Sequence, residues 1–322
     1  MKALSVRNLP VGMFGAVMGL AGLGLTARAA AALFPGVFRA PAYFTELWVA
    51  LGVLALILLV PLYLVKWLRF PDAAKAEFLN PAQMGFCATF PVGITLVAGG
   101  LGPYLPLGAL GLWWAGVVLL FVFQVWGLCR VLSGGIELAQ LNAGWLILFV
   151  GGIVVPGSGI ALGEIEAARF MFGFSTAVAP LIVAILVYRA AFAPPLPEPL
   201  RPSWFILLVP PSLIYAHGLA FYSDFNFLEN LFYLSVVLAI ALLVYARGCL
   251  RWPFGPAWWA FTFPLDALAY AAVRYAQQHP SAPWRAVAAA SLVVATLFVA
   301  LVLLRTLHSL FATDRSVASP AA

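Results

Sequence analysis

Residues 78–129 read FLNPAQMGFCATFPVGITLVAGGLGPYLPLGALGLWWAGVVLLFVFQVWGLC and contain no Asp, Glu, Lys or Arg. A transmembrane helix needs about 20 consecutive, predominantly apolar residues. The stretch is therefore long enough for two such helices. The sequence GPYLP at 102–106 predicts the turn between them, because glycine and proline interrupt helices. This helical hairpin is the unit from which we interpret the rest of the chain.

The composition of the whole chain also indicates a membrane protein. Of the 322 residues, 64% are hydrophobic and 9% are charged, and the mean hydropathy is +1.04. Soluble domains contain about 25% charged residues, so these values exclude a water-soluble enzyme. The apolar runs are continuous and do not alternate at a period of two, which argues against a β-barrel.

Ten apolar runs predict an all-α integral membrane protein, with residues 1–322 forming one transmembrane domain that has short cytoplasmic tails. A cleaved signal peptide is the alternative for the first run, because Ala27-Arg28-Ala29 imitates a cleavage site. The glycine-rich face Gly12, Gly15 and Gly19 favours a retained helix that packs closely. The helices are expected near 10–33, 44–68, 83–102, 108–132, 144–163, 169–190, 203–221, 227–250, 257–276 and 284–311.

The basic residues predict the orientation of these helices. Ten helices place both termini on one side, and that side then holds Lys2, Arg7, Lys66, Arg69, Lys75, Arg130, Arg189, Arg201, Arg247, Arg251, Arg305 and Arg315. The opposite side holds Arg28, Arg39, Arg169, Arg274 and Arg285. By the positive-inside rule both termini are cytoplasmic. The net charge of +6 therefore needs no nucleic-acid partner.

Prolines in alternate helices form an internal repeat. They interrupt the third, fifth, seventh and ninth helices, at Pro91, Pro156, Pro210-Pro211 and Pro264, and Val17 takes the equivalent place in the first. Backbone groups freed by proline are tolerated in a membrane only where they face protein or a water-filled cavity. We therefore predict five helical hairpins in a pseudo-five-fold arrangement. The odd helices surround a central pore and the even ones face lipid or other subunits. The alternative is that the prolines only shape packing.

Polar residues inside the runs are candidate site residues. Asp266 follows Pro264 by two residues, and an isolated acid in a span commonly faces an interior cavity. Asp266 and His217 could each bind a proton or ion. Otherwise they serve as structural partners for nearby groups. Ser158, Ser212 and Thr262 lie beside the kinks, where they could line the path or bond to a nearby carbonyl.

Phe90 and Phe263 each precede a kink proline. A large ring in a narrow path excludes water and blocks ions, although aromatic packing between helices is the alternative. Anion preference would come from helix N-termini and basic residues at the cytoplasmic mouth, because no basic residue falls mid-way in an odd helix. The three cysteines form no disulfide or zinc pattern, and phosphate-loop and HExxH motifs are absent. We therefore expect neither an enzyme nor a bound metal or cofactor.

Three motifs carry a family resemblance: LPVGMFGAVMGLAGLGLTARA at 9–29, FPVG at 90–93 and WWAFTFPLDALAYA at 258–271. They resemble the tellurite-resistance/dicarboxylate transporter family, which includes bacterial TehA-type channels, slow anion channels of plant guard cells and fungal malate permeases. The resemblance implies ten helices in five hairpins around a pore, a homotrimer, and occlusion by a phenylalanine. The FTFP motif places that gate at Phe263, or at Phe261 if the register slips.

These observations predict an anion channel or channel-like transporter for small inorganic or organic anions in the cell inner (cytoplasmic) membrane. The alternative is a proton-coupled carrier of small dicarboxylates or oxyanions (malate-, sulfite- or tellurite-type), with Asp266 or His217 as proton acceptor. Efflux of lipophilic cations or tellurite is a third possibility. The expected pore-lining residues are Gly15, Val17, Phe90, Pro91, Pro156, Ser158, Pro211, Ser212, Thr262 and Pro264.

Overall fold

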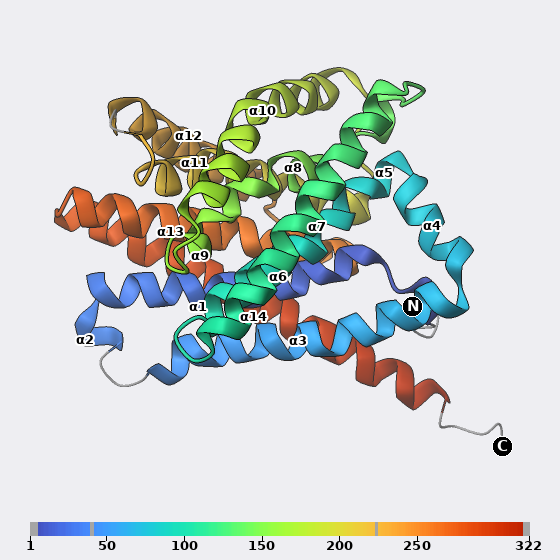
Figure 1. Cartoon of the computed structure of the whole chain (residues 1–322), viewed down its shortest axis with the longest axis horizontal. Coiled ribbons are helices and arrows are strands. Elements are labelled where there is room, and N and C mark those ends of the chain that lie inside the picture. The colour runs from blue at the N-terminus through green and yellow to red at the C-terminus, as the bar shows by residue number, and fades with distance from the viewer. Residues whose placement is uncertain (1–5, 39–41, 223–224, 318–322) are drawn as a thin grey trace.

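The chain folds into helices throughout the part that the computed structural model describes, which is residues 6–38, 42–222 and 225–317. Lys2 and Arg39, which entered the charge comparison above, lie outside these residues. The chain enters α1 and leaves α14 at the same end of the molecule (Figure 1).

Five long helices form an outer layer in the described part of the chain. Each is apolar and unbroken, and Pro61 and Pro180 lie inside two of them without ending the helix. The five are α3 (Ala42–Arg69), α7 (Pro106–Leu132), α10 (Ile165–Phe192), α12 (Phe225–Tyr245) and α14 (Ala282–Val317). Buried residues make up only 22–28% of their most apolar stretches, so most of their side chains are left to face lipid or another subunit.

Five inner segments alternate with these helices, and each is a 3₁₀-helix followed or flanked by α-helix. They are η2–α1 (Val11–Phe14, Gly15–Leu33), η3–α6 (Gly85–Ala88, Thr89–Leu101), α8–η5–α9 (Gly144–Val150, Gly151–Val154, Pro156–Gly159), η6–α11 (Glu198–Leu208, Val209–Gly218) and η8–α13 (Pro256–Phe261, Thr262–Gln278). In the first two, buried residues make up 67% and 78% of the most apolar stretch, so the inner layer is the buried one.

The repeated prolines mark the point where the 3₁₀-helix gives way to the α-helix. Pro91, Pro211 and Pro264 are each the third residue of an α-helix, Pro156 is the first of α9, and Val17 is the third of α1. The first N–H groups of an α-helix have no intrahelical acceptor, so proline costs little there. The prolines thus begin new α-helices and do not kink the middle of continuous ones.

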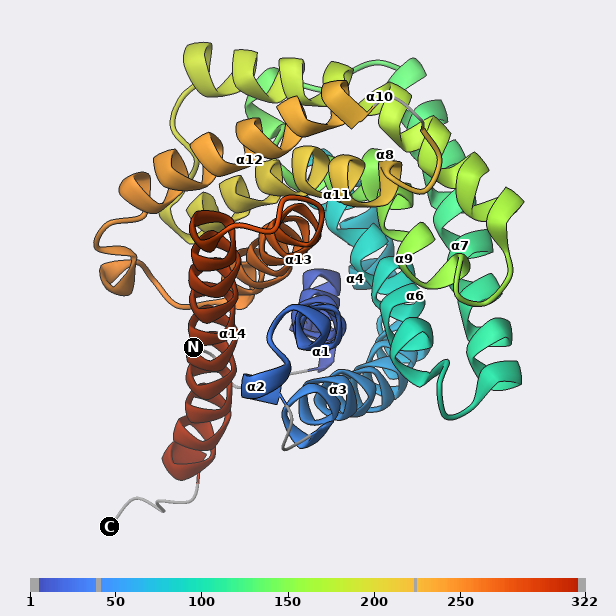
Figure 2. The same cartoon turned by 90° about the vertical axis from the view of Figure 1, so that its left-hand side faces the viewer.

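The inner segments contact one another in a closed order. α1 packs on α6, α6 on η5 and α9, η5 on α11, α11 on α13, and α13 returns to α1. Each outer helix packs on the inner segment that precedes it in the chain, as α3 does on α1 and α14 on α13. Figure 2 shows α1, α6, α9, α11 and α13 inside α3, α7, α10, α12 and α14.

The prediction of an all-α membrane protein is confirmed, with seven helices of the described chain long and apolar enough to span a bilayer. The predicted runs at 144–163, 203–221 and 257–276 are composite segments whose breaks keep each α-helical piece short. The sequence interpretation missed the short helices: η1 (Val6–Asn8), α2 (Pro35–Phe38), α4 (Pro71–Leu79), α5 (Pro81–Met84), η4 (Leu138–Gln140) and η7 (Cys249–Arg251).

Glycines allow the closest approaches between inner segments. A Cβ added to Gly19 would lie 2.6 Å from the Cβ of Thr262, so α1 and α13 pack closely at this glycine of the predicted face. A Cβ on Gly85 would lie 2.6 Å from the carbonyl oxygen of Gly144. A backbone oxygen cannot rotate away, so η3 and α8 require glycine at this contact.

We expect Gly85→Ala to destabilise the fold by about 1–3 kcal/mol, the usual cost of overpacking. Gly111→Ala is the matched control, because a Cβ there meets no atom within 4 Å. Thermal unfolding in detergent should show a lower midpoint for Gly85→Ala and an unchanged or higher one for Gly111→Ala. Equal midpoints for the two variants would contradict the contact.

Candidate functional site

A cavity of about 330 Å³ lies among the five inner segments, near the start of four of them. Every inner segment contributes residues, four of them from the N-terminal part and α8–η5–α9 from its middle, including Gly12 and Gly15, Phe86 and Val92, Val150 and Val154, Ile206 and Pro210, and Trp259 and Phe263. Most of the lining side chains are apolar. A concave site formed by every inner segment is the main candidate for a binding or conduction site.

Phe263 lies at the far end of this cavity. The lining residues extend along α13 as far as Pro264 and along α1 as far as Met18. Beyond that level the Phe263 ring packs against α1, because a Cβ on Gly22 would lie 2.9 Å from Phe263 Cδ2. Phe263 is 6% exposed, so its side chain is buried between the cavity and α1.

The other two phenylalanines named from the sequence lie elsewhere. Phe90 is half-buried, and its ring centroid is 4.6 Å from that of Phe14. Phe261 is fully buried among aromatic rings, with centroid distances of 4.7 Å to Phe205 and 5.3 Å to Phe298 of α14. Neither borders the cavity, so of these three only Phe263 does.

The remaining expected pore-lining residues divide into two groups. Gly15 and Pro264 border the cavity, as does Pro210 in place of its neighbour Pro211. The others are buried without bordering it: Val17, Pro91, Pro156, Ser158, Pro211, Ser212 and Thr262.

The three hydroxyl groups near the prolines are buried in different environments. Thr262 Oγ1 donates to the carbonyl of Trp259 at 2.8 Å, one turn earlier. Ser158 Oγ donates to the carbonyl of Thr95 on α6 at 3.1 Å. Ser212 Oγ has no hydrogen-bond partner within the described residues. Two of these hydroxyls thus stabilise backbone groups beside the breaks.

Asp266 lies just beyond Phe263 and is 1% exposed. Neither carboxylate oxygen has a hydrogen-bond partner in the described part of the chain. A Cβ on Gly22 would lie 3.1 Å from its Oδ2, so Asp266 and Phe263 pack against the same glycine. An unpartnered acid at this depth is costly and marks a functional candidate.

His217 has a satisfied ring nitrogen. Its Nδ1 lies 2.7 Å from the carbonyl oxygen of Ile153, and since a carbonyl only accepts, Nδ1–H is the donor. The ring packs 5.5 Å from that of Tyr270. This geometry is what a packing histidine requires, although Nε2 remains able to accept a proton.

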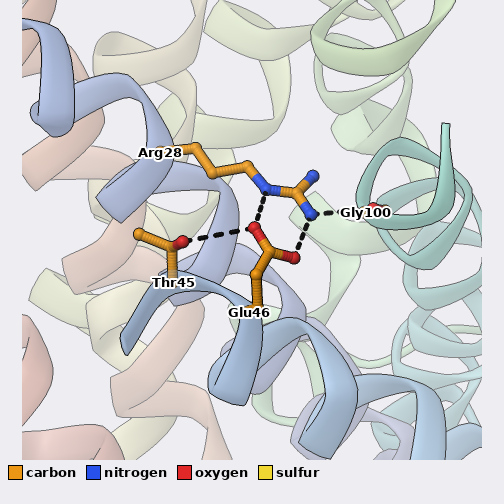
Figure 3. Close-up of polar contacts among 4 residues, drawn as sticks. All are labelled: Arg28, Thr45, Glu46 and Gly100. Carbon is orange, nitrogen blue, oxygen red and sulfur yellow. Dashed lines mark hydrogen bonds and ion pairs between the residues drawn. The ribbon is translucent and has the colours of Figure 1, made fainter. Parts of the chain in front are cut away.

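The sequence interpretation missed an ion pair between Arg28 and Glu46 (Figure 3). Arg28 lies in the C-terminal half of α1, whereas the cavity is lined by the start of that helix. Arg28 Nε donates to Glu46 Oε1 at 2.9 Å, and its Nη2 donates to Glu46 Oε2 and, at 3.0 Å, to the carbonyl of Gly100. Thr45 Oγ1 also donates to Glu46 Oε1. The bidentate pair joins α1, α3 and α6. In the sequence, the only indication of this ion pair is that Arg28 and Glu46 lie at adjacent ends of the two helices of one hairpin.

A second missed pair lies beside the cavity. Lys66 Nζ is 2.7 Å from Glu77 Oε1, and Lys66 is 1% exposed. Among the described residues that line the cavity, Glu77 is the only charged one. Lys66 was assigned from the sequence only to one membrane side, because the sequence interpretation did not anticipate α4, which carries Glu77.

Residues 8–307 match the family model described as voltage-dependent anion channel. The chain belongs to this family. An uncharacterised transporter of Methanocaldococcus jannaschii is 25% identical over 303 residues, which cover 81% of this chain and 82% of that protein. The guard cell S-type anion channel of Arabidopsis thaliana is 23% identical over 342 residues, covering 97% of this chain and 58% of the channel. A sulfite efflux pump of Arthroderma benhamiae is 24% identical over 326 residues, covering 86% and 84%.

Membership confirms the resemblance that the three motifs indicated. The protein is a multi-pass membrane protein of an anion channel and transporter family and is not an enzyme. Its homologues include anion channels and sulfite efflux pumps, so the family implies anion substrates.

We expect the Arg28–Glu46 pair to stabilise the first hairpin, since a hydrogen bond to a charged group contributes about 1.5–3 kcal/mol. Arg28→Met and Glu46→Gln should each lower the thermal midpoint in detergent. The double variant should lose less than the sum of the two, because neither charge is then left alone. Strict additivity would show that the pair is not coupled.

Proposed function

We propose that this chain is an anion channel or channel-like transporter of ten transmembrane helices in five hairpins. The five inner segments line the conduction path with pseudo-five-fold symmetry, and Phe263 occludes it. The observation that carries this proposal is the cavity to which all five inner segments contribute and which Phe263 borders. Membership in an anion channel family supports the same assignment.

The Phe263 ring accounts for closure in physical terms. A permeating anion is stabilised by its hydration shell. An apolar ring in a narrow path excludes this water, so the anion cannot pass. The α-helical parts of four inner segments begin near the level of the cavity, at Gly15, Thr89, Val209 and Thr262. Their N-termini present partial positive charge, which favours anions without holding them at a fixed cation.

Assembly and orientation complete the proposal. Residues 1–322 form one transmembrane domain in the cell inner membrane, and the ends of the helical bundle at Val6 and Val317 both lie on the cytoplasmic side. The five outer helices expose apolar side chains, which suits a homotrimer embedded in lipid. The cavity then lies toward the cytoplasmic side, because four of the five inner segments line it with their N-terminal parts.

We expect Phe263→Ala to raise anion conductance in planar bilayers by roughly tenfold or more, which corresponds to a barrier lowered by about 1.4 kcal/mol. Phe261→Ala is the matched control, because that ring packs against Phe205 and Phe298 away from the cavity. Phe90→Ala should have a smaller effect than Phe263→Ala. If Phe261→Ala raises the conductance and Phe263→Ala does not, the gate is Phe261. If no variant changes the conductance, the proposed phenylalanine gate is wrong.

A proton-coupled carrier of small dicarboxylates or oxyanions is the second candidate. The buried carboxylate of Asp266 next to Phe263, which has no hydrogen-bond partner among the described residues, favours it, as do relatives named as sulfite efflux pumps. In that mechanism Asp266, or His217, takes up a proton in each transport cycle. Reversal potentials under chloride, nitrate, malate, sulfite and proton gradients distinguish the two, because only the carrier couples substrate to protons.

For a channel, we expect Asp266→Asn to retain anion conduction and to change it less than Phe263→Ala does. The physical reason is that Asp266 lies off the cavity, so its charge contributes little to the path. Loss of all transport in a well-folded Asp266→Asn variant, with proton coupling demonstrated in the parent, would establish the carrier instead.

A further inference from the structure

Glu77 brings a carboxylate to the wall of a cavity that we propose conducts anions. It lies on α4, the charged helix that connects the first hairpin to the second, and it borders the cavity together with Pro10 and Val11. A lone carboxylate in an apolar cavity with low-dielectric walls would repel anions strongly, because such walls focus its field. Its counter-charge therefore matters for conduction.

Both carboxylate oxygens of Glu77 are occupied from the side away from the cavity. Lys66 Nζ donates to Oε1 at 2.7 Å, and the Tyr63 hydroxyl donates to Oε2 at 2.6 Å. Lys66 Nζ also donates to the carbonyl of Leu9 at 2.7 Å and lies 5.3 Å from the centroid of the Tyr63 ring. Lys66 itself does not border the cavity.

The geometry is more specific than a surface ion pair. At 1% exposure Lys66 has given up its hydration, which is costly and is repaid only by a close partner. Glu77 belongs to the cavity wall, whereas Lys66 lies behind it. The negative charge therefore lies nearer to a permeating ion than the positive charge does.

We propose that Glu77 and Lys66 are specificity-determining residues of the conduction path, with Lys66 as the counter-charge that keeps the carboxylate-bearing wall permissive to anions. This inference rests on the proposed function. In this inference, the buried Lys66–Glu77 pair determines the electrostatic potential at the cavity wall.

The test uses the full chain with Phe263→Ala as the open parent, in liposomes that contain KCl. Lys66→Met should lower the chloride-to-potassium permeability ratio, because it leaves Glu77 charged at the wall. Glu77→Gln should raise the ratio, because it removes the repulsion and leaves Lys66 positive. We expect changes of roughly threefold or more in 10 mM salt. They should shrink at 1 M salt, where the Debye length falls from about 30 Å to about 3 Å.

Glu166→Gln and Arg169→Met provide matched controls. They make the same kinds of charge change in an exposed pair whose residues lie outside the cavity lining. Neither should change the ratio. The inference is overturned if Lys66→Met and Glu77→Gln shift the permeability ratio in the same direction, or if the shifts do not depend on the salt concentration. The pair then has only a structural role.

The exchanged variant Lys66→Glu/Glu77→Lys keeps the test decisive if a single variant fails to fold. It retains both charges but moves the positive one to the wall, so the chloride-to-potassium ratio should rise above that of the parent. A folded exchanged variant with an unchanged ratio would overturn the inference. A parent that conducts no anions would overturn the proposed function itself, and this inference with it.

Discussion

The structure depends on the cost of an unpaired backbone group in hydrocarbon. Each inner segment changes from 3₁₀-helix to α-helix, and most carry proline at the change, so each departs from the continuous hydrogen-bond pattern of an α-helix. Such a segment cannot face lipid. The five unbroken outer helices shield the five interrupted inner ones, and the interrupted backbone is directed to the interior, where it surrounds the cavity.

The ion pairs extend the same reasoning to charges. Helix α3 carries Glu46 near one end and Lys66 near the other, and each forms a pair with a residue of a neighbouring element. Arg28 fixes α3 to the far end of α1, while Lys66 fixes it to α4 and to the backbone before α1. The first hairpin is therefore fastened at both ends, and its charged groups stay out of the apolar middle.

Much of this architecture could be predicted from the sequence, because long apolar runs and repeated prolines report directly on burial and helix breaks. The outer helices could be predicted from the apolar runs alone. The equivalent positions of Pro91 and Pro264 could be predicted from the FPVG and FTFP motifs. The helix type before each proline could not be predicted, because hydropathy does not distinguish a 3₁₀-helix from an α-helix. Helix α4 was not predicted because Asp72, Lys75 and Glu77 keep its residues out of the apolar runs. Which of Phe261 and Phe263 borders the cavity depends on which face of η8–α13 meets α14, and only the three-dimensional packing contains that information.

The closed order of the inner segments has a consequence for how the chain assembles. Every outer helix packs on the inner segment just before it, so each hairpin can form locally as it leaves the translocon. The contact between α1 and α13 is different, since the hydroxyl of Thr26 donates to the carbonyl of Asp266 from 240 residues away. Gly22 meets Phe263 at the same interface. The first helix to be synthesised must therefore wait, with its glycine face uncovered, until the ninth segment of the chain is inserted and the ring closes.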